Sequence, residues 1–150
     1  MRLYLMHREA YLNYLKAQSR VEEILDEREQ LIQSVMPKSS LAEHEREFLP
    51  TSVPVKGRSM NKAERYAIEM EERLLKTRLE EATDALEHRK LILSERESEL
   101  RKSLDIYNLV YTAKWIDGKK VEAIVKDTGY SRSQIYNIIR YLTGKVGRYE

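Results

Sequence analysis

The stretch VEAIVKDTGYSRSQIYNIIR, residues 121–140, specifies two short helices and the turn between them more tightly than any other part of the chain. Gly129 falls between the two helical segments, and glycine adopts the left-handed backbone of a tight turn without steric cost. Ser131 and Gln134 have the spacing of a capping box, in which two backbone N–H groups at a helix start are satisfied by side chains. These signals predict a helix, a turn and a second helix, in that order.

Apolar side chains on both predicted helices indicate that the pair packs onto one core. Spacings of three and four residues place these side chains on one face of each helix. Tyr130 is expected to pack onto Ile135 as a hydrophobic staple, and Thr143-Gly144 is expected to end the second helix. The predicted inward-facing residues are Val121, Ile124, Val125, Ile135, Ile138, Ile139 and Leu142.

A further apolar stripe predicts a helix upstream of this pair. The stripe begins after Ser103 and ends at Asp117-Gly118, where the pattern stops. We therefore expect one compact domain over residues 103–150. The members of the stripe are Leu104, Tyr107, Val110, Tyr111 and Trp115.

The outward face of the second helix carries hydrogen-bond donors and no carboxylate. Arg132, Tyr136 and Arg140 are successive four-residue neighbours, and two short polar side chains form a parallel row. Arginine pairs with guanine and asparagine with adenine in the major groove, whereas serine and tyrosine hydroxyls reach phosphates. The alternative is an ordinary polar helix face. The residues assigned to DNA binding are Ser131, Arg132, Ser133, Tyr136, Asn137 and Arg140, flanked by the phosphate clamps Lys119, Lys120, Lys145 and Arg148.

Charge is distributed unevenly along the chain. Residues 101–150 hold ten Lys and Arg against five Asp and Glu, a net charge of +5, whereas residues 1–100 hold seventeen against twenty. The C-terminal third is therefore the part expected to face a polyanion.

Two long helices are predicted ahead of this domain. Residues 1–36 are expected to form the first helix, and residues 61–102 a long charged helix that begins at Asn61. The intervening residues 37–60 contain all three prolines and several serines, which predicts a linker, with a short helix over 41–48. The apolar stripe of the first helix comprises Tyr11, Tyr14, Leu15, Val21, Leu25, Ile32 and Val35.

The second long helix has leucines every seven residues, at Leu79, Leu86, Leu93 and Leu100, but lacks good apolar partners between them. We therefore expect a helix packed on a neighbour and not a long zipper. Two interpretations of the long helices remain open: a solvated helical hairpin without a site, or an oligomerisation or partner-binding module. The predicted fold class is all-α, with long N-terminal helices in a helical hairpin or coiled-coil-like arrangement.

Composition argues against several classes of function. The chain has no cysteine, which removes disulfides and thiolate chemistry, and its five glycines fit no phosphate-binding loop. The three histidines lack partners at metal-ligand spacing, and the carboxylates alternate with cations as solvated ion pairs do. We expect no enzyme activity, no cofactor, no metal and no membrane association. A cytoplasmic location in a bacterial host cell is expected.

Residues 121–140 resemble the helix-turn-helix class. Gly129 falls at the turn position of its twenty-residue pattern, and Ile124, Tyr130, Ile135 and Ile138 fall at its apolar positions. Val125 departs from the pattern, because that position is usually alanine. The longer stretch YNLVYTAKWIDGKKVEAIVKDTGYSRSQIYNIIRYL, together with the layout of the chain, resembles the ArpU/RinA-type phage late-gene transcriptional regulators, whose C-terminal part is similar to the promoter-reading helix-turn-helix of sigma factors.

That resemblance implies activation of phage or prophage late genes through promoter binding, and contact with RNA polymerase. The expected partners are double-stranded DNA and a second copy of the chain in a homodimer. Two alternatives stay open: a DNA-packaging protein like a phage terminase small subunit, and a helical adaptor whose helix-turn-helix binds protein.

Overall fold

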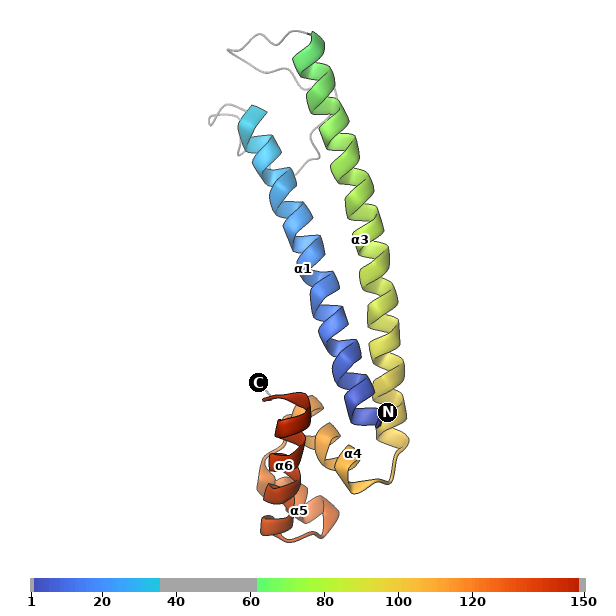
Figure 1. Ribbon diagram of the computed structural model, residues 1–150, viewed down its shortest axis with the longest axis vertical. Helices are drawn as coiled ribbons and strands as arrows, with labels where there is room; N and C mark the ends of the chain where they lie inside the picture. Colours follow the sequence, from blue (N-terminus) through green and yellow to red (C-terminus); the bar gives the residue numbers. More distant parts are fainter. Residues whose placement is uncertain (1, 36–61, 149–150) are drawn as a thin grey trace. The chain divides into compact units, whose positions relative to one another are not determined.

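The structure is a computed structural model that describes residues 2–35 and 62–148. Its elements are α1 (Leu3–Val35), α3 (Lys62–Lys102), α4 (Ile106–Tyr111), the π-helical η1 (Thr112–Ile116), α5 (Val121–Thr128) and α6 (Arg132–Val146) (Figure 1). The described residues include no strand, so the predicted all-α class is confirmed. The linker expected over 37–60, the short helix over 41–48 and the Asn61 cap lie outside the described residues.

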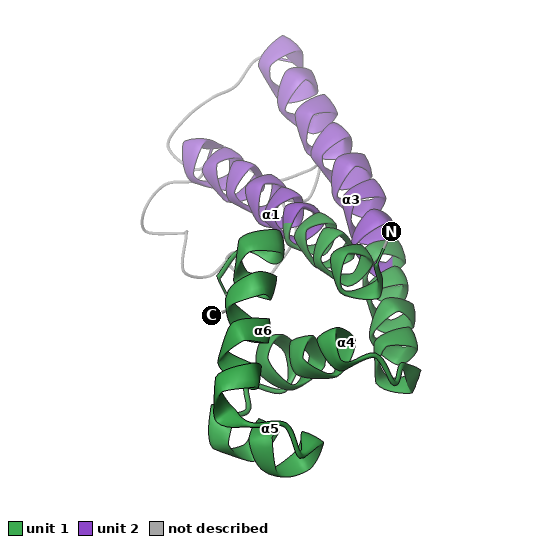
Figure 2. Ribbon diagram, turned by 60° about the horizontal axis from the view of Figure 1, so that its bottom comes forward, with its two compact units in different colours: residues 1–15, 88–150 green, residues 16–87 purple. Residues whose placement is uncertain are grey.

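The chain divides into two compact units (Figure 2). The first comprises residues 1–15 and 88–150, and the second comprises residues 16–87. The unit that contains α5 and α6 therefore also includes the start of α1 and the last part of α3. We expected residues 103–150 to form a domain of their own, whereas in this division they share one unit with those two segments.

In the second unit, α1 and α3 lie side by side and antiparallel (Figure 1). Their shared core contains Ile24, Leu31 and Val35 from α1 with Leu75 and Ala82 from α3. Such a pair is stabilised mainly by burying this apolar seam, because long isolated helices are marginal in water. The prediction that the second long helix packs on a neighbour is confirmed.

The apolar stripe predicted on α1 was partly wrong. Leu25 is 44% exposed, whereas its neighbour Ile24 is 1% exposed. The buried positions on α1 form two groups with helical spacing, Tyr4, His7 and Ala10 near its start and Ile24, Leu31 and Val35 in its second half. The inner face therefore lies about one residue earlier in the sequence than the stripe we inferred.

The first unit is built on a core to which α1, α3, α4, α5 and α6 all contribute. Leu100 of α3 and Tyr4 of α1 are buried in this core together with Val110 and Tyr111. Leu104 was expected to join them but is 92% exposed. The reason is local, because Asp105 caps α4 through a 3.3 Å bond from the backbone N–H of Asn108, which leaves Leu104 in the connection before the helix.

The predicted end of α6 at Thr143-Gly144 was also wrong. The helix continues to Val146 and ends at Gly147, whose φ is +85°. Leu142 and Val146 are one turn apart and both buried. Burial of a valine contributes about 1.5 to 3 kcal/mol, more than the ~1 kcal/mol that a glycine inside a helix costs.

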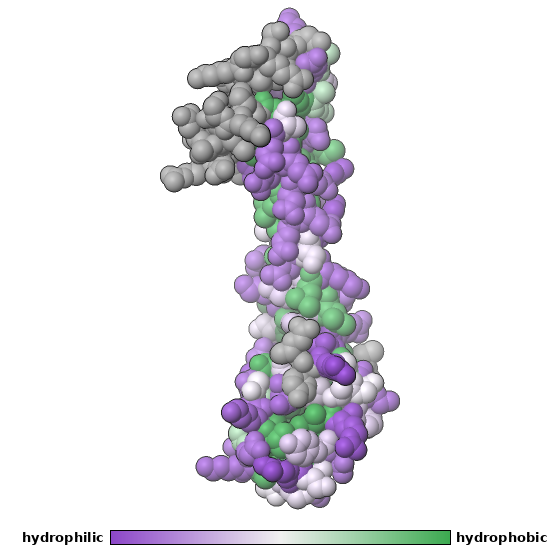
Figure 3. All heavy atoms as spheres, turned by 90° about the vertical axis from the view of Figure 1, so that its left-hand side faces the viewer, coloured by the Kyte–Doolittle hydropathy of each residue, from purple (hydrophilic) through white to green (hydrophobic). Residues whose placement is uncertain are grey.

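The surface of the long helices is largely hydrophilic in the view of Figure 3. Within residues 2–35 and 62–148, no helix is both long and apolar enough to cross a bilayer.

Candidate nucleic-acid interface

The turn between α5 and α6 has the geometry predicted from the sequence. Gly129 has φ +75° and donates its N–H to the carbonyl of Val125 at 2.9 Å, which closes α5. Ser131 Oγ accepts from the backbone N–H of Gln134 at 3.2 Å, and Gln134 Oε1 accepts from the N–H of Ser131 at 2.9 Å. The capping box is therefore confirmed, and it fixes where α6 begins.

The inner side of the two helices is packed as expected. Ile135 and Leu142 are fully buried, and Val125 packs on the same core. Tyr130 differs, because its side chain is 39% exposed although the helix-turn-helix pattern places it among the apolar positions. Its staple onto Ile135 stays a prediction.

The six residues from Ser131 to Arg140 that were assigned to DNA binding, called the reading face from here on, are all exposed. Ser131 caps α6 and the other five lie on its first three turns, opposite the buried isoleucines, and α6 itself contains no carboxylate. Helical geometry places Arg132, Tyr136 and Arg140 in one row along this face, with Ser133 and Asn137 in the next. The structure thus presents one polar surface with arginine, asparagine and hydroxyl groups.

An acid that the sequence analysis missed lies beside this face. Glu122 of α5 accepts a hydrogen bond from the guanidinium of Arg132, and the two side chains are 64% and 60% exposed. An exposed ion pair of this kind contributes only about 0 to 1 kcal/mol, so Arg132 can exchange Glu122 for another acceptor at small cost. Residue spacing gave no signal for this contact, because the partners are ten residues apart and lie on two helices joined by a turn.

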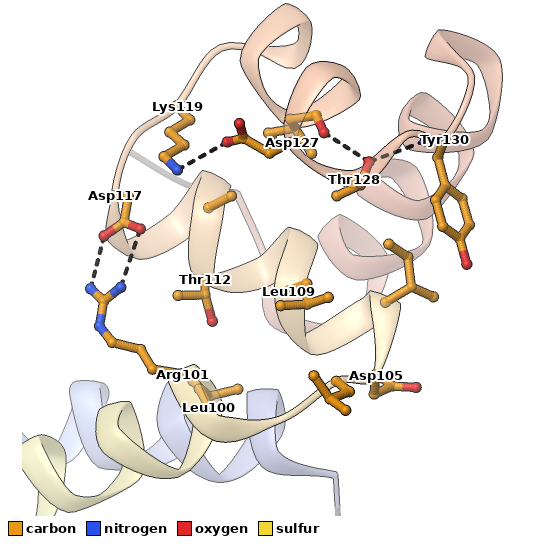
Figure 4. Close-up of a pocket in the computed structure, with 14 residues that line it drawn as sticks. Leu100, Arg101, Asp105, Leu109, Thr112, Asp117, Lys119, Asp127, Thr128 and Tyr130 are labelled. Carbon is orange, nitrogen blue, oxygen red and sulfur yellow. Dashed lines mark hydrogen bonds and ion pairs between the residues drawn. The ribbon is translucent and has the colours of Figure 1, made fainter.

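The four predicted phosphate clamps occupy different environments. Lys119 donates to Asp127 at 3.1 Å (Figure 4), and Lys120 is exposed at the position before α5. The ammonium of Lys145 lies 5.6 Å from the centre of the Tyr141 ring, within the last turn of α6 and not beyond the helix as predicted. Arg148 lines a pocket with residues of α1 and η1, apart from the reading face residues.

Two hydrogen bonds outside the predicted site join distant parts of the first unit, one between α1 and α4 and one between η1 and the residue that follows α6. Tyr111 OH lies 2.7 Å from Nδ1 of His7, and the Trp115 indole N–H donates to the carbonyl of Gly147 at 3.4 Å. Burial lowers the pKa of His7 and raises the pKa of Tyr111 to about 12, so this pair is uncharged at neutral pH. The three-residue spacing from Tyr4 to His7, which places both on one face of α1, is the sequence signal that could have indicated this buried face.

A second link joins α3 to the end of η1. Arg101 donates to both carboxylate oxygens of Asp117, at 2.8 and 3.3 Å (Figure 4). These hydrogen bonds lower the pKa of the Asp117 carboxyl. A bidentate pair fixes orientation as well as distance, so it helps to set where η1 ends and the loop toward α5 begins.

Comparisons with models of known protein families, with curated proteins and with solved structures find no match to this chain. The described residues contain no cluster of three or more His, Asp or Glu side chains suited to a metal ion.

Proposed function

We propose that this protein is a sequence-specific DNA-binding regulator of transcription, in which α6 enters the major groove. The observation that carries the proposal is the exposed, carboxylate-free face of α6, held directly after the Gly129 turn. The partners are double-stranded DNA and a second copy of the chain, because a homodimer reads two half-sites.

The dimensions of α6 suit the groove. An α-helix with its side chains is about 10 to 12 Å in diameter. The major groove is about 12 Å wide, so such a helix fits into it and can present the side chains of its first turns to base edges. In this arrangement Arg132 and Asn137 read bases, whereas Lys145 contacts phosphate.

The biological role follows from the family resemblance and not from geometry. A similarity to ArpU/RinA-type regulators supports activation of phage or prophage late genes at a promoter, with contact to RNA polymerase. No described feature favours DNA packaging or a protein adaptor over this role, so both serve as outcomes of the test.

The test begins with selection of bound duplexes from a random pool by the full-length protein, followed by anisotropy titrations on the selected and a scrambled duplex. Arg132→Ala and Asn137→Ala should each weaken binding to the selected duplex by about 1 to 3 kcal/mol, and weaken the scrambled duplex much less. Lys145→Ala should weaken both alike and reduce the salt slope by about one unit. Lys90→Ala is the control, since it removes one exposed charge from α3.

Glu122→Gln is the matched partner of Arg132→Ala. It releases the guanidinium and removes a negative charge beside the groove, so it should strengthen binding by roughly two- to fivefold. If selection enriches no sequence, or if Arg132→Ala has no more effect than Lys90→Ala, the proposal is wrong. A ring of about eight or more subunits would favour packaging, and absence of DNA affinity at low salt would favour the adaptor.

A further inference from the structure

A pocket of the first unit, the one that Arg148 lines, is separate from the reading face. It has a volume of about 510 Å³ and is lined by residues of α1, α3 and η1, with Arg148 at its edge. Pockets of roughly 300 to 1,000 Å³ commonly hold small molecules. All of its lining residues belong to one compact unit.

One wall of this pocket is aromatic: Trp115 is partly exposed and supplies the accessible ring, and Tyr111, which is 1% exposed, backs it. The rings of Tyr111 and Trp115 are stacked, with centroids 5.4 Å apart and planes 13° from parallel. Trp115 lies in η1, and π-helical turns occur frequently at functional sites. Leu12 and Leu15 add partly exposed apolar surface. A flat, apolar group fits such a lining better than a polar one does.

The polar groups of the pocket favour an anion. The guanidinium of Arg8 stacks over Tyr11 at 5.4 Å, yet its Nε is buried without a hydrogen-bond partner in the described structure. A buried donor left unsatisfied costs about 1 to 3 kcal/mol, more when it is charged. Because this Nε is closed to solvent, the Arg8 side chain must shift before a ligand acceptor can reach it, and that acceptor would then satisfy the donor. Arg148 contributes a second positive charge at the rim.

The other ionisable groups facing the pocket offset these cations only in part. Glu97 accepts two hydrogen bonds from Arg101, at 2.9 and 3.2 Å, but Arg101 is shared with Asp117, so Glu97 still offsets one of the two cations, Arg8 and Arg148. The imidazole of His7 is bonded to Tyr111 OH, and burial lowers its pKa. The remaining field in the pocket is therefore positive.

From these features we infer that the pocket between Arg8 and Trp115 binds a small planar aromatic anion, with its ring against the aromatic wall and its carboxylate on the Arg8 guanidinium. This site is independent of the proposed DNA contact. Trp115 is nevertheless bonded to the carbonyl of Gly147 at the end of α6, so an occupant would contact a residue that is joined to the end of the reading helix.

Benzoate is the probe, because it combines the two features in the smallest form. Trp115 is the only tryptophan of the chain, so its indole N–H gives one assigned peak in a proton–nitrogen correlation spectrum of the full-length protein. Titration should move this peak saturably, with half-saturation at about 1 mM, the range that so small a ligand can reach. Acetate, which lacks the ring, and benzyl alcohol, which lacks the charge, should each bind at least about tenfold more weakly.

Arg8→Met keeps the length of the side chain and removes the guanidinium, so it should raise the half-saturation concentration for benzoate about tenfold. Arg20→Met on the exposed face of α1 is the control and should leave it unchanged. If Arg8→Met does not fold, Arg148→Met replaces it, with an expected two- to threefold weakening. No saturable shift, equal binding of benzyl alcohol, or unchanged binding in both pocket variants would overturn the inference.

Discussion

Two glycines of the helix-turn-helix should respond to the same substitution with opposite signs. Gly129 has φ +75°, where an L-residue is strained, and a Cβ there would meet nothing within 4 Å. Gly144 has helical backbone inside α6, and a Cβ there also has open space. Alanine therefore tests the backbone alone at both positions, without a contribution from clashes.

The magnitudes follow from the two backbone conformations. A left-handed conformation costs an L-residue about 1 to 2 kcal/mol, so Gly129→Ala should reduce the free energy of unfolding by that amount. Alanine is preferred over glycine by about 1 kcal/mol inside a helix, so Gly144→Ala should increase it by 0.5 to 1 kcal/mol. For a unit of this size, 1 kcal/mol corresponds to roughly 4 to 8 °C in melting temperature.

The assay is urea and thermal unfolding of the full-length protein, followed by the fluorescence of Trp115, which reports on the first unit. We expect a gap of about 1.5 to 3 kcal/mol between the two variants. If Gly144→Ala is as destabilising as Gly129→Ala, α6 ends at Gly144 as the sequence suggested, and the extension to Val146 is wrong.

Two further predictions concern buried polar groups. Burial lowers the pKa of His7 from 6.5, so the unfolded chain binds a proton at a higher pH than the folded chain does. The free energy of unfolding should therefore decline as the pH falls through and below about 6.5. The melting temperature, measured from about pH 7.5 to 5.5, should decline less steeply in His7→Gln than in the wild type. The exposed control His88→Gln should decline as the wild type does, and equal slopes in all three proteins would contradict the assignment. In the second unit, Arg28 and Glu72 are 15% and 8% exposed and their Nε and Oε1 atoms are 4.0 Å apart, so Arg28→Met alone should cost about 3 kcal/mol by leaving a buried carboxylate, whereas the double change to methionine should be neutral or stabilising in urea unfolding. A double variant less stable than the wild type would show that the pair is a net gain and would contradict this expectation.

Sequence reasoning succeeded where the signal is local. The capping box of Ser131 and Gln134 and the left-handed Gly129 depend on neighbours within three residues, and the structure has both. The end of α6 was misplaced because Gly144 was weighed by its propensity, whereas burial of Val146 decides the outcome. Leu104 was misplaced because apolar spacing took no account of the Asp105 cap.

The candidate site shows the same division between local and distant interactions. The exposed row of α6 could be derived from helical periodicity, but the tertiary contacts of this unit could not. Glu122 reaches Arg132 across the turn, and His7 reaches Tyr111 across 104 residues. Such contacts depend on tertiary packing, for which one sequence offers only weak hints such as the spacing of Tyr4 and His7.

Glu122 and Asp127, whose ion pairs with Arg132 and Lys119 were not predicted, bear on how α6 would discriminate between DNA sequences. Both Arg132 and Lys119 are held by exposed carboxylates of α5, so docking on any DNA must break pairs that contribute up to about 1 kcal/mol each. In the proposed complex, Arg132 would regain this energy on a matching site through two bonds to guanine, worth about 1 to 3 kcal/mol. On a random site it would not, and Glu122 would be left near phosphates, which would disfavour the wrong sequence. We therefore expect Glu122→Gln to raise affinity for scrambled DNA more than for the selected site, so that tighter binding comes with a smaller ratio between the two.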